Sequence, residues 1–254
     1  MRIDKITLSQ QTKKPVFGYE KRLVLTPQKK LLYRTTTCFF RDDLLWNNLM
    51  LFLQSKFRDV PKVQIINHAC SDGEETYSLA LKLSCYFKNE AQKFFPIVAK
   101  DLDKKNIETA KKGIYHIRDY EHRDIVENSD GRFNEFFELK NIEDFNYPNA
   151  KKTDKLLIVK DSLKEKINFQ QANIVNDFSG KNEPIENTLL VCRNFWPYLK
   201  QEDGKNLLVA LAKRIKCPSA IVFGRFDSDF ELSNKLKKCG FTYSELPYVM
   251  QKFY

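Results

Sequence analysis

The sequence predicts an α/β fold in which a mostly parallel, twisted sheet is flanked by helices. Short apolar runs typical of strands alternate with helical patterns over most of the chain, as parallel strands joined by right-handed crossovers require. The most informative unit is residues 63–78, where an apolar run ends at a tight turn around Gly73 and a helical pattern opens with Glu74 and Glu75. Ligands of such sheets bind outside the carboxyl ends of the strands, so this turn is a candidate site.

The elements expected on this basis alternate in order along the chain. A helical pattern begins near Asp42 and ends before Pro61, and residues 242–254 have the pattern of a terminal antiparallel hairpin. The expected strands are 63–67, 96–101, 167–170, 188–192 and 219–223, and the expected helices are 74–88, 103–112, 201–215 and 229–239. One domain over residues 35–254 accounts for all of them.

Two segments fall outside this alternation. Residues 114–165 are polar and charged with short aromatic clusters, and we expect an insertion or small subdomain there, with a flexible stretch near 146–155. Residues 1–34 lack sustained periodicity and are expected to form an arm with at most one turn of regular structure. The arm has nine basic and two acidic residues, a net charge of +7 within the +10 of the chain. Such an arm suits an acidic protein surface, a nucleic acid or anionic lipid, although a solvated lysine-rich segment explains the charge equally well.

Composition argues against several classes of protein. No apolar run approaches the roughly 18 residues of a membrane span, and the first residues lack the apolar core of a secretory signal. The six cysteines have no Cys-x-x-Cys spacing; they are Cys38, Cys70, Cys85, Cys192, Cys217 and Cys239. We therefore expect a cytoplasmic protein with reduced thiols, no membrane insertion and no metal site. The oligomeric state is open, with a monomer favoured.

Acidic residues at the start of the 74–88 helix indicate the class of ligand. A loop that binds phosphate presents bare backbone N–H groups at a helix start and avoids acidic side chains. Glu74 and Glu75 instead favour a ligand with hydroxyl groups or positive charge. S-adenosylmethionine, which has a sulfonium, an ammonium group and a ribose, fits that description.

Two further strand ends bring polar side chains to the same edge of the sheet. Asp101 follows the second strand, where an acid can accept both hydroxyls of a ribose, although an acid at such a junction is more often a helix cap. Arg193 and Asn194 follow the fourth strand, and an arginine there can pair with a carboxylate or hold a neighbouring loop. Ahead of the first helical pattern, Thr37 and Arg41 are four residues apart and would share one side of a helix if that segment is helical. Phe39 and Phe40 between them are expected to be core anchors.

Several motifs that occur in order carry a resemblance. The main ones are Thr37-x-Phe-Phe-Arg41-Asp, Cys70-Ser-x-Gly-Glu-Glu-x-Tyr-Ser78, Asp101-x-Asp103 and Cys192-Arg-Asn194-x-x-x-Tyr198. Others are Ala110-x-x-Gly113-x-Tyr115, Ile167-x-Phe-x-x-x-Asn173 and Phe223-Gly224. Over about residues 35 to 228 the chain resembles the CheR family of chemotaxis receptor methyltransferases. The resemblance implies a Rossmann-like class I methyltransferase fold and the use of S-adenosylmethionine, with S-adenosylhomocysteine as product, to esterify glutamate side chains of chemoreceptors.

The resemblance also implies a role for each matching residue. Lining the cofactor pocket would be Thr37, Gly73, Glu74, Glu75, Asp101, Asn173 and Asn194. Which of the two glutamates contacts the cofactor stays open. Arg41 and Tyr198 would lie beside the methyl group as the catalytic pair, and Arg193 would support the substrate side or the cofactor side. The implied partner is the cytoplasmic helical bundle of a chemoreceptor, an acidic surface that suits the basic arm.

The chain departs from the family pattern at three places. The family usually has a helical domain of several dozen residues where this chain has the 1–34 arm. Asp72 and Thr76 stand where Thr and Pro are usual, and Asp72 could pair with the ammonium group of the cofactor, cap the following helix, or repel the cofactor carboxylate. Phe223-Gly-Arg-Phe-Asp227-Ser stands where Gly-His-Ser-Glu is usual, and the sequence offers no account of that change.

These departures leave two alternatives to receptor methylation. The chain could be a catalytically degenerate relative that binds S-adenosylmethionine or an acidic partner without transferring a methyl group. It could also be a nucleic-acid methyltransferase, as the net charge of +10 allows. The second alternative is the weaker one, because the prolyl-rich catalytic tetrapeptide of base amino-methylation and the interleaving of aromatic and basic residues are both missing.

Overall fold

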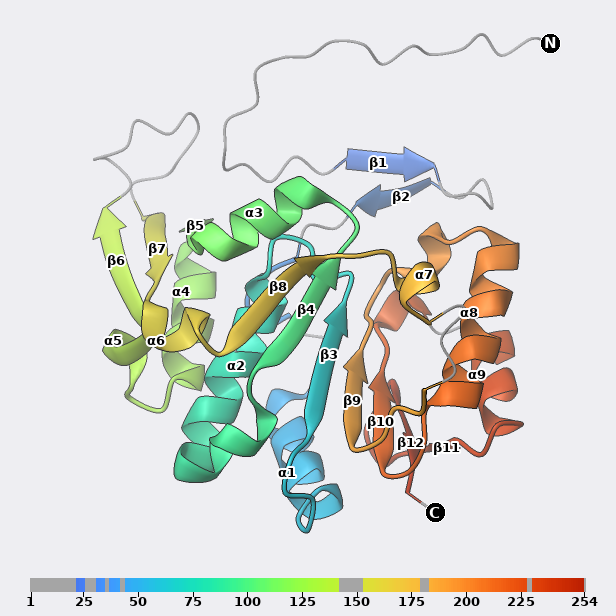
Figure 1. Ribbon diagram of the computed structural model, residues 1–254. Coiled ribbons are helices and arrows are strands. Elements are labelled where there is room, and N and C mark those ends of the chain that lie inside the picture. Colours follow the sequence, from blue (N-terminus) through green and yellow to red (C-terminus); the bar gives the residue numbers. More distant parts are fainter. Residues whose placement is uncertain are drawn as a thin grey trace, which may run out of the picture.

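The centre of the molecule is a seven-stranded sheet with the order β11-β12-β10-β9-β3-β4-β8 (Figure 1). The computed structural model describes residues 22–25, 31–34, 37–41, 44–141, 153–178, 183–227 and 230–253. The parallel strands are β3 (Gln64–His68), β4 (Ile97–Asp101), β8 (Ile167–Gln171), β9 (Thr188–Val191) and β10 (Ser219–Val222). β12 (Val249–Lys252) pairs antiparallel with both β10 and β11 (Thr242–Tyr243). The predicted class is therefore confirmed, including the terminal antiparallel hairpin.

Helices follow the parallel strands as the alternation predicts. They are α1 (Trp46–Lys56) before β3, then α2 (Glu74–Phe87), α3 (Lys104–Lys112), α7 (Ile174–Phe178), α8 (Gln201–Arg214) and α9 (Phe230–Lys237). Short 3-10 turns are η1 (Lys88–Phe94), η3 (Trp196–Tyr198) and η4 (Arg225–Asp227). The five-residue helix α7 was not expected from the sequence, because one turn and a half gives too little periodicity to detect.

The order of the strands locates the ligand-binding edge. From β3 the chain moves outward through β4 to β8, then returns to the other side of β3 to build β9 and β10. β3 pairs in parallel with β4 on one side and with β9 on the other, so the carboxyl ends of these three strands lie together. In open α/β sheets, ligands bind at the point where the strand order reverses in this way.

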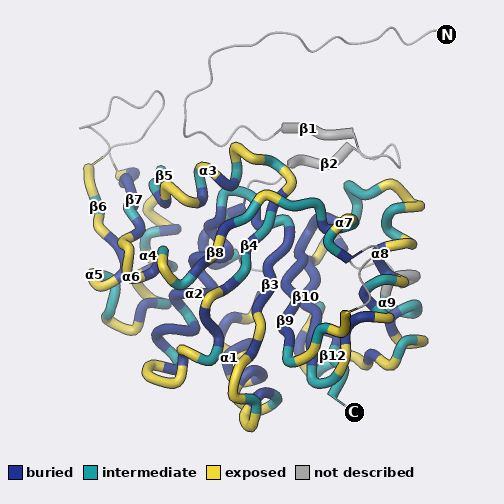
Figure 2. The backbone as a smooth tube through the Cα atoms, in the orientation of Figure 1, coloured by how far each residue is buried: buried dark blue, intermediate teal, exposed yellow. Residues whose placement is uncertain are grey.

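Burial on both faces of the sheet explains why its strands were predictable. Leu189 and Val191 belong to the hydrophobic cluster on one face, whereas Leu190, between them, belongs to the cluster on the other face. Figure 2 shows β3, β9 and β10 as an almost wholly buried centre. Strands buried on both faces are continuous apolar runs, which is how 188–192 stands out in the sequence.

Residues 114–165 contain a separate antiparallel sheet with the order β5-β7-β6. Its strands are β5 (Ile114–Ile117), β6 (Phe137–Asn141) and β7 (Lys155–Val159), with α4 (Asp119–Asn128), α5 (Phe133–Phe136) and α6 (Asp161–Lys164) beside them. Phe39 packs edge-on against both Tyr115 and Phe137, at 5.2 and 6.3 Å between ring centroids, and so joins this sheet to the main body. Of the stretch near 146–155, only 153–155 lie within the described residues.

The basic arm has more regular structure than the sequence suggested. β1 (Arg22–Leu25) and β2 (Leu31–Arg34) pair antiparallel, where at most one turn was expected. The remainder of the 1–34 arm lies outside the described residues. None of the helices in the described ranges is long and apolar enough to cross a membrane.

Candidate functional site

The loop between β3 and α2 is a tight, strained turn at the ligand-binding edge. Ala69, Ser71 and Gly73 have φ angles of 59°, 51° and 95°, all in the left-handed region that favours glycine. A Cβ at Gly73 would lie 2.8 Å from the Ala110 Cβ and 3.2 Å from the Phe169 ring, so only glycine fits. The tight turn predicted around Gly73 therefore requires glycine for a steric reason.

Asp101 holds this loop in place. Its Oδ2 accepts a hydrogen bond of 2.8 Å from the Ser71 N–H, and its Oδ1 accepts from the Asp103 N–H at 2.9 Å and from Asn106 Nδ2 at 3.2 Å. The helix cap considered for Asp101 is provided by Asp103 instead, whose side chain accepts from the Lys105 N–H. Asp101 therefore anchors the loop and keeps capacity at Oδ2 for one further donor, such as a hydroxyl.

Thr37 supplies the cap that α2 lacks. Gly73 is the N-cap of α2 and has no side chain with which to cap the helix. The Thr37 hydroxyl accepts from the Glu75 N–H at 3.3 Å, and the Phe40 N–H donates to Ser78 Oγ at 3.0 Å. The segment 37–41 thus lies along the start of α2.

The segment 37–41 is a turn rather than a helix. Phe40 has a φ of 47°, so the condition under which Thr37 and Arg41 would share one side of a helix is not met. Phe39 and Phe40 are buried, as expected of core anchors. Arg41 is half-buried and lies near enough to Cys38 to lower the pKa of its thiol, although burial is the larger effect and raises that pKa to about 12.

The two adjacent glutamates at the start of α2 have different environments. Glu75 forms a buried ion pair with Arg193, whose Nη1 lies 2.5 Å from Glu75 Oε2. Glu74 is also buried, and its Oε2 has no hydrogen-bond partner within the described part of the chain. Burial raises the pKa of Glu74 well above its usual range, and the nearby carboxylates of Asp72, Glu121 and Glu75 raise it further.

This difference distinguishes the two glutamates by their environment. Arg193 already neutralises Glu75, whereas the unpartnered Glu74 Oε2 is a buried acceptor beside a second acid, Asp72. A cationic ligand would compensate both carboxylates and keep Glu74 ionised. Glu121, which the sequence analysis did not single out, reaches this group from α4, where it also accepts from the Arg118 N–H at 3.0 Å.

A buried carboxylate holds the segment after β9 in place. The Asp227 carboxylate accepts from the backbone N–H groups of Asn194, Gly224 and Trp196. Tyr198 is half-buried in η3, which packs near η4. Asp227 was noted in the sequence only as part of an unexplained departure, because its role depends on a contact between distant segments.

Asn173 lies at the same edge, at the end of β8. The Ala172 N–H donates to the Asp101 carbonyl at 2.9 Å, which places the two strand ends side by side. The Asn173 Oδ1 accepts from the Val175 N–H at 2.9 Å and so caps α7. Taken together, the contacts above link Thr37 to Glu75, Glu75 to Arg193, and Asp101 to the first loop.

Comparison with known proteins identifies the family. A family model described as "CheR methyltransferase, SAM binding domain" matches residues 35–244. The chain belongs to this family. A chemotaxis protein methyltransferase of Borreliella burgdorferi (strain ATCC 35210 / DSM 4680 / CIP 102532 / B31) is 27% identical over 202 residues. The aligned part is 76% of this chain and 64% of that relative, so the chain spans less than two thirds of the relative's length.

Solved structures of other methyltransferases are similar at lower identity. Magnesium protoporphyrin IX methyltransferase from Synechocystis PCC 6803, with SAM bound, is 10% identical, with 82% of this chain and 77% of that chain covered and a TM-score of 0.41. The N-methyltransferase NodS from Bradyrhizobium japonicum WM9, with S-adenosyl-L-homocysteine, is 12% identical, with 80% and 79% covered and a TM-score of 0.41.

The cofactor of the CheR family domain is S-adenosylmethionine, and the residues at this edge suit it. Its ammonium group matches the unpartnered, buried Oε2 of Glu74, and a ribose hydroxyl matches the remaining acceptor capacity of Asp101. Asp72, beside Glu74, adds negative charge on the ammonium side. In the described ranges no group of three or more His, Cys, Asp or Glu side chains is arranged to hold a metal ion.

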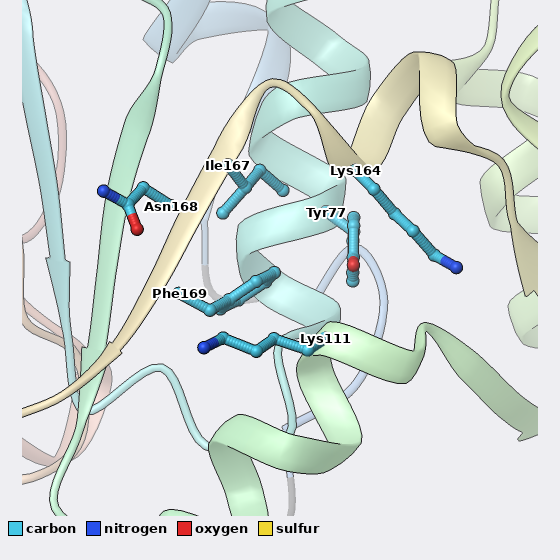
Figure 3. A pocket seen from close by; sticks show the side chains of 6 residues that line it. All are labelled: Tyr77, Lys111, Lys164, Ile167, Asn168 and Phe169. Carbon is cyan, nitrogen blue, oxygen red and sulfur yellow. The ribbon is translucent and has the colours of Figure 1, made fainter.

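A separate cavity of about 230 Å³ lies beside the edge strand β8 and is lined by Tyr77, Lys111, Lys164, Ile167, Asn168 and Phe169 (Figure 3). None of the predicted site residues lines it. Figure 3 shows the ammonium groups of Lys111 and Lys164 extending to opposite sides, so the two lysines do not converge on a single anion.

Replacement of Gly73 tests whether the shape of the first loop is needed for the cofactor. Gly73→Ala adds a Cβ that clashes with Ala110 and imposes backbone strain of about 1–3 kcal/mol, so we expect weaker S-adenosylmethionine binding in calorimetric titration. Gly131→Ala is the matched control, because Gly131 has a φ of 73° but nothing within 4 Å of the new Cβ. An equal loss of affinity in both variants would contradict the steric explanation.

The environment of Glu74 predicts that cofactor binding releases protons. Because the pKa of Glu74 is raised in the free protein and a bound cation lowers it, the carboxyl group holds its proton less tightly in the complex than in the free protein. The same raised pKa means that the contribution of Glu74 to the stability of the free protein declines as the pH rises above about 4.3. Calorimetry in buffers of different ionisation enthalpy measures the released protons.

Two variants separate the adjacent glutamates in this experiment. Glu74→Gln is expected to abolish the proton release and to weaken binding roughly tenfold, the loss of one charge-assisted interaction. Glu75→Gln removes the partner of Arg193, so it should lower the free energy of unfolding by about 3–5 kcal/mol and leave the proton release in place. Proton release that persists in Glu74→Gln would show that another group titrates.

Proposed function

We propose that the chain transfers the methyl group of S-adenosylmethionine to glutamate side-chain carboxylates of chemoreceptor proteins, as part of adaptation in chemotaxis. The observation that carries this proposal is the family match over residues 35–244, which includes every residue assigned to the site. The printed name of the Borreliella burgdorferi relative, a chemotaxis protein methyltransferase, supports the choice of chemotaxis.

The proposed reaction needs orientation more than acid–base chemistry. When bound, S-adenosylmethionine supplies an electrophilic methyl group on a positively charged sulfur. A glutamate side chain, with a pKa of about 4.3, is already a carboxylate at neutral pH, so no general base has to remove a proton. One carboxylate oxygen forms a bond to the methyl carbon while the carbon–sulfur bond breaks, and the two opposite charges are neutralised together. The protein's task is in-line alignment and exclusion of water.

Arg41 and Tyr198 are proposed to orient the incoming carboxylate. Arg41 is half-buried in the turn that runs along α2, near Cys38, and the acids Glu74 and Glu75 also act on that thiol. An arginine can hold a carboxylate with two parallel hydrogen bonds, which fixes its orientation. Tight neutralisation would reduce the nucleophilicity of the carboxylate, so a half-buried arginine suits orientation better than a fully desolvated one.

The proposed partner is the cytoplasmic helical bundle of a chemoreceptor, which presents acidic residues. A chain with a net charge of +10 is attracted to such a surface over a Debye length of about 8–10 Å. Asp72 keeps the degenerate-relative alternative open, because its negative charge near Glu74 would also repel the carboxylate end of the cofactor. The test below distinguishes these outcomes.

Incubation with methyl-labelled S-adenosylmethionine and membranes from the same cell tests the proposed function. We expect label in receptor-sized protein, released as methanol by mild alkali because a glutamate methyl ester is base-labile. Alkali-stable label would indicate transfer to nitrogen. Cofactor binding without label in protein or nucleic acid would favour the non-catalytic relative.

Arg41→Ala should separate transfer from cofactor capture. Because Arg41 is proposed to orient the substrate carboxylate, we expect the transfer rate to fall about 100-fold or more while the calorimetric affinity for S-adenosylmethionine stays within a few-fold. Arg123→Ala is the matched control: its arginine is exposed on α4 and pairs only loosely with Asp119, at 3.8 Å. Parallel loss of transfer and cofactor affinity in Arg41→Ala would assign Arg41 to the cofactor instead.

A further inference from the structure

We propose that the Phe223–Asp227 segment is a positioning element for Asn194, with Asp227 as its anchor, an inference that rests on the proposed function of this site. Asp227 is 2% exposed, and its carboxylate is engaged by the backbone of the segment after β9, so we do not expect it to contact the substrate. It would act through Asn194, and it is therefore a positioning residue rather than a catalytic one.

The first support is the number of backbone donors that converge on one carboxylate. Asp227 Oδ2 accepts from the Asn194 N–H and from the Gly224 N–H, the latter at 2.8 Å, and Oδ1 accepts from the Trp196 N–H at 3.2 Å. Two of these donors belong to the segment that leads from β9 to Tyr198. A single side chain thus fixes the path of the backbone on which the predicted site residues stand.

The second support is the conformation of Asn194 itself. Its φ of 57° is in the left-handed region, which costs free energy for a residue with a side chain and persists only where the surroundings impose it. A Cβ built on Gly224 would overlap the carboxamide of Asn194 at Oδ1, Cγ and Nδ2. Gly224 therefore leaves the space in which the Asn194 side chain lies, while Asp227 holds its N–H.

The third support is the charge on the anchor. Burial raises the pKa of Asp227 to about 7, and the hydrogen bonds from Gly224, Asn194 and Trp196, together with Arg193, lower it from a still higher value. The buried thiol of Cys192 also faces Asp227, and burial raises the pKa of that thiol while Trp196 lowers it. A protonated Asp227 has an O–H that would face three N–H donors, so the anchor weakens as the pH falls through about 7.

Stability and cofactor affinity should respond to this titration with opposite signs. The folded-state pKa of Asp227 lies above its ordinary value of about 3.9, so protonation between these values favours the folded protein. The contribution of Asp227 to the free energy of unfolding therefore rises as the pH falls from 7.5 to 5.5, while the cofactor affinity falls. A purely structural role would move both in the same direction.

The experiment measures S-adenosylmethionine affinity of the full chain by calorimetry between pH 5.5 and 8.5, with thermal unfolding at each pH. In Asp227→Asn we expect roughly tenfold weaker binding at pH 8, because the amide presents an N–H₂ to backbone donors, and a smaller loss of affinity between pH 8 and pH 6 than in the unchanged protein. Glu74 remains in both proteins, so the difference between the two pH profiles measures the part that belongs to Asp227, and identical profiles would contradict the proposed role. Asp161→Asn, an exposed acid on α6, is the control and should match the unchanged protein.

A second variant keeps the inference testable if Asp227→Asn does not fold. Gly224→Ala keeps the carboxylate and displaces the Asn194 side chain, so it should lose a similar affinity and retain the inflection near pH 7. Unchanged affinity in both variants, or an affinity loss that follows unfolding, would overturn the proposal. A chain that shows the expected pattern but transfers no methyl group would overturn the proposed function and leave the anchor standing.

Discussion

A buried ion pair between Glu75 and Arg193 joins the two halves of the sheet at its carboxyl edge. Glu75 is in the first turn of α2, after β3, and Arg193 follows β9, the next strand along the edge. Buried charges are costly unless they are paired, so each residue fixes the position of the other. The pair sets the distribution of charge in the candidate site. Arg193 neutralises Glu75, so Glu74 is the carboxyl group whose charge a cationic ligand would balance.

The excess of acid around Glu74 has a cost in the free protein. Asp72, Glu75 and Glu121 each raise the pKa of Glu74. They do so because several negative charges close together in a buried site repel one another, which favours the protonated form. The replacement of the family's usual Thr by Asp72 increases this effect. A cationic ligand balances these negative charges. The relief of their repulsion therefore adds to the free energy of binding. The departure at position 72 is thus compatible with a stronger attraction for the ammonium group.

Sequence patterns were sufficient for the main sheet because strands buried on both faces are apolar runs. They were insufficient for the β5-β7-β6 sheet, whose outer strand β6 is largely exposed and whose β5 pairs with a strand some forty residues later. They predicted candidate residues at the ends of β3, β4 and β9 but could not separate Glu74 from Glu75, because adjacent residues share one motif and it is the Arg193 contact that distinguishes them. The role of Asp227 could not be predicted either, because it depends on contacts with the distant segment after β9.

The two loops that form the site use one structural device. Each contains a left-handed residue other than glycine, Ser71 in the first loop and Asn194 in the second, and each such N–H donates to a buried carboxylate from another segment, Asp101 or Asp227. A residue other than glycine keeps a left-handed backbone conformation only where surrounding contacts impose it. Such strained residues are common at functional sites. A carboxylate that accepts several backbone N–H groups can impose the conformation, since charge-assisted hydrogen bonds are about twice as strong as neutral ones. The rigidity of this edge therefore comes from acids that contact the backbone.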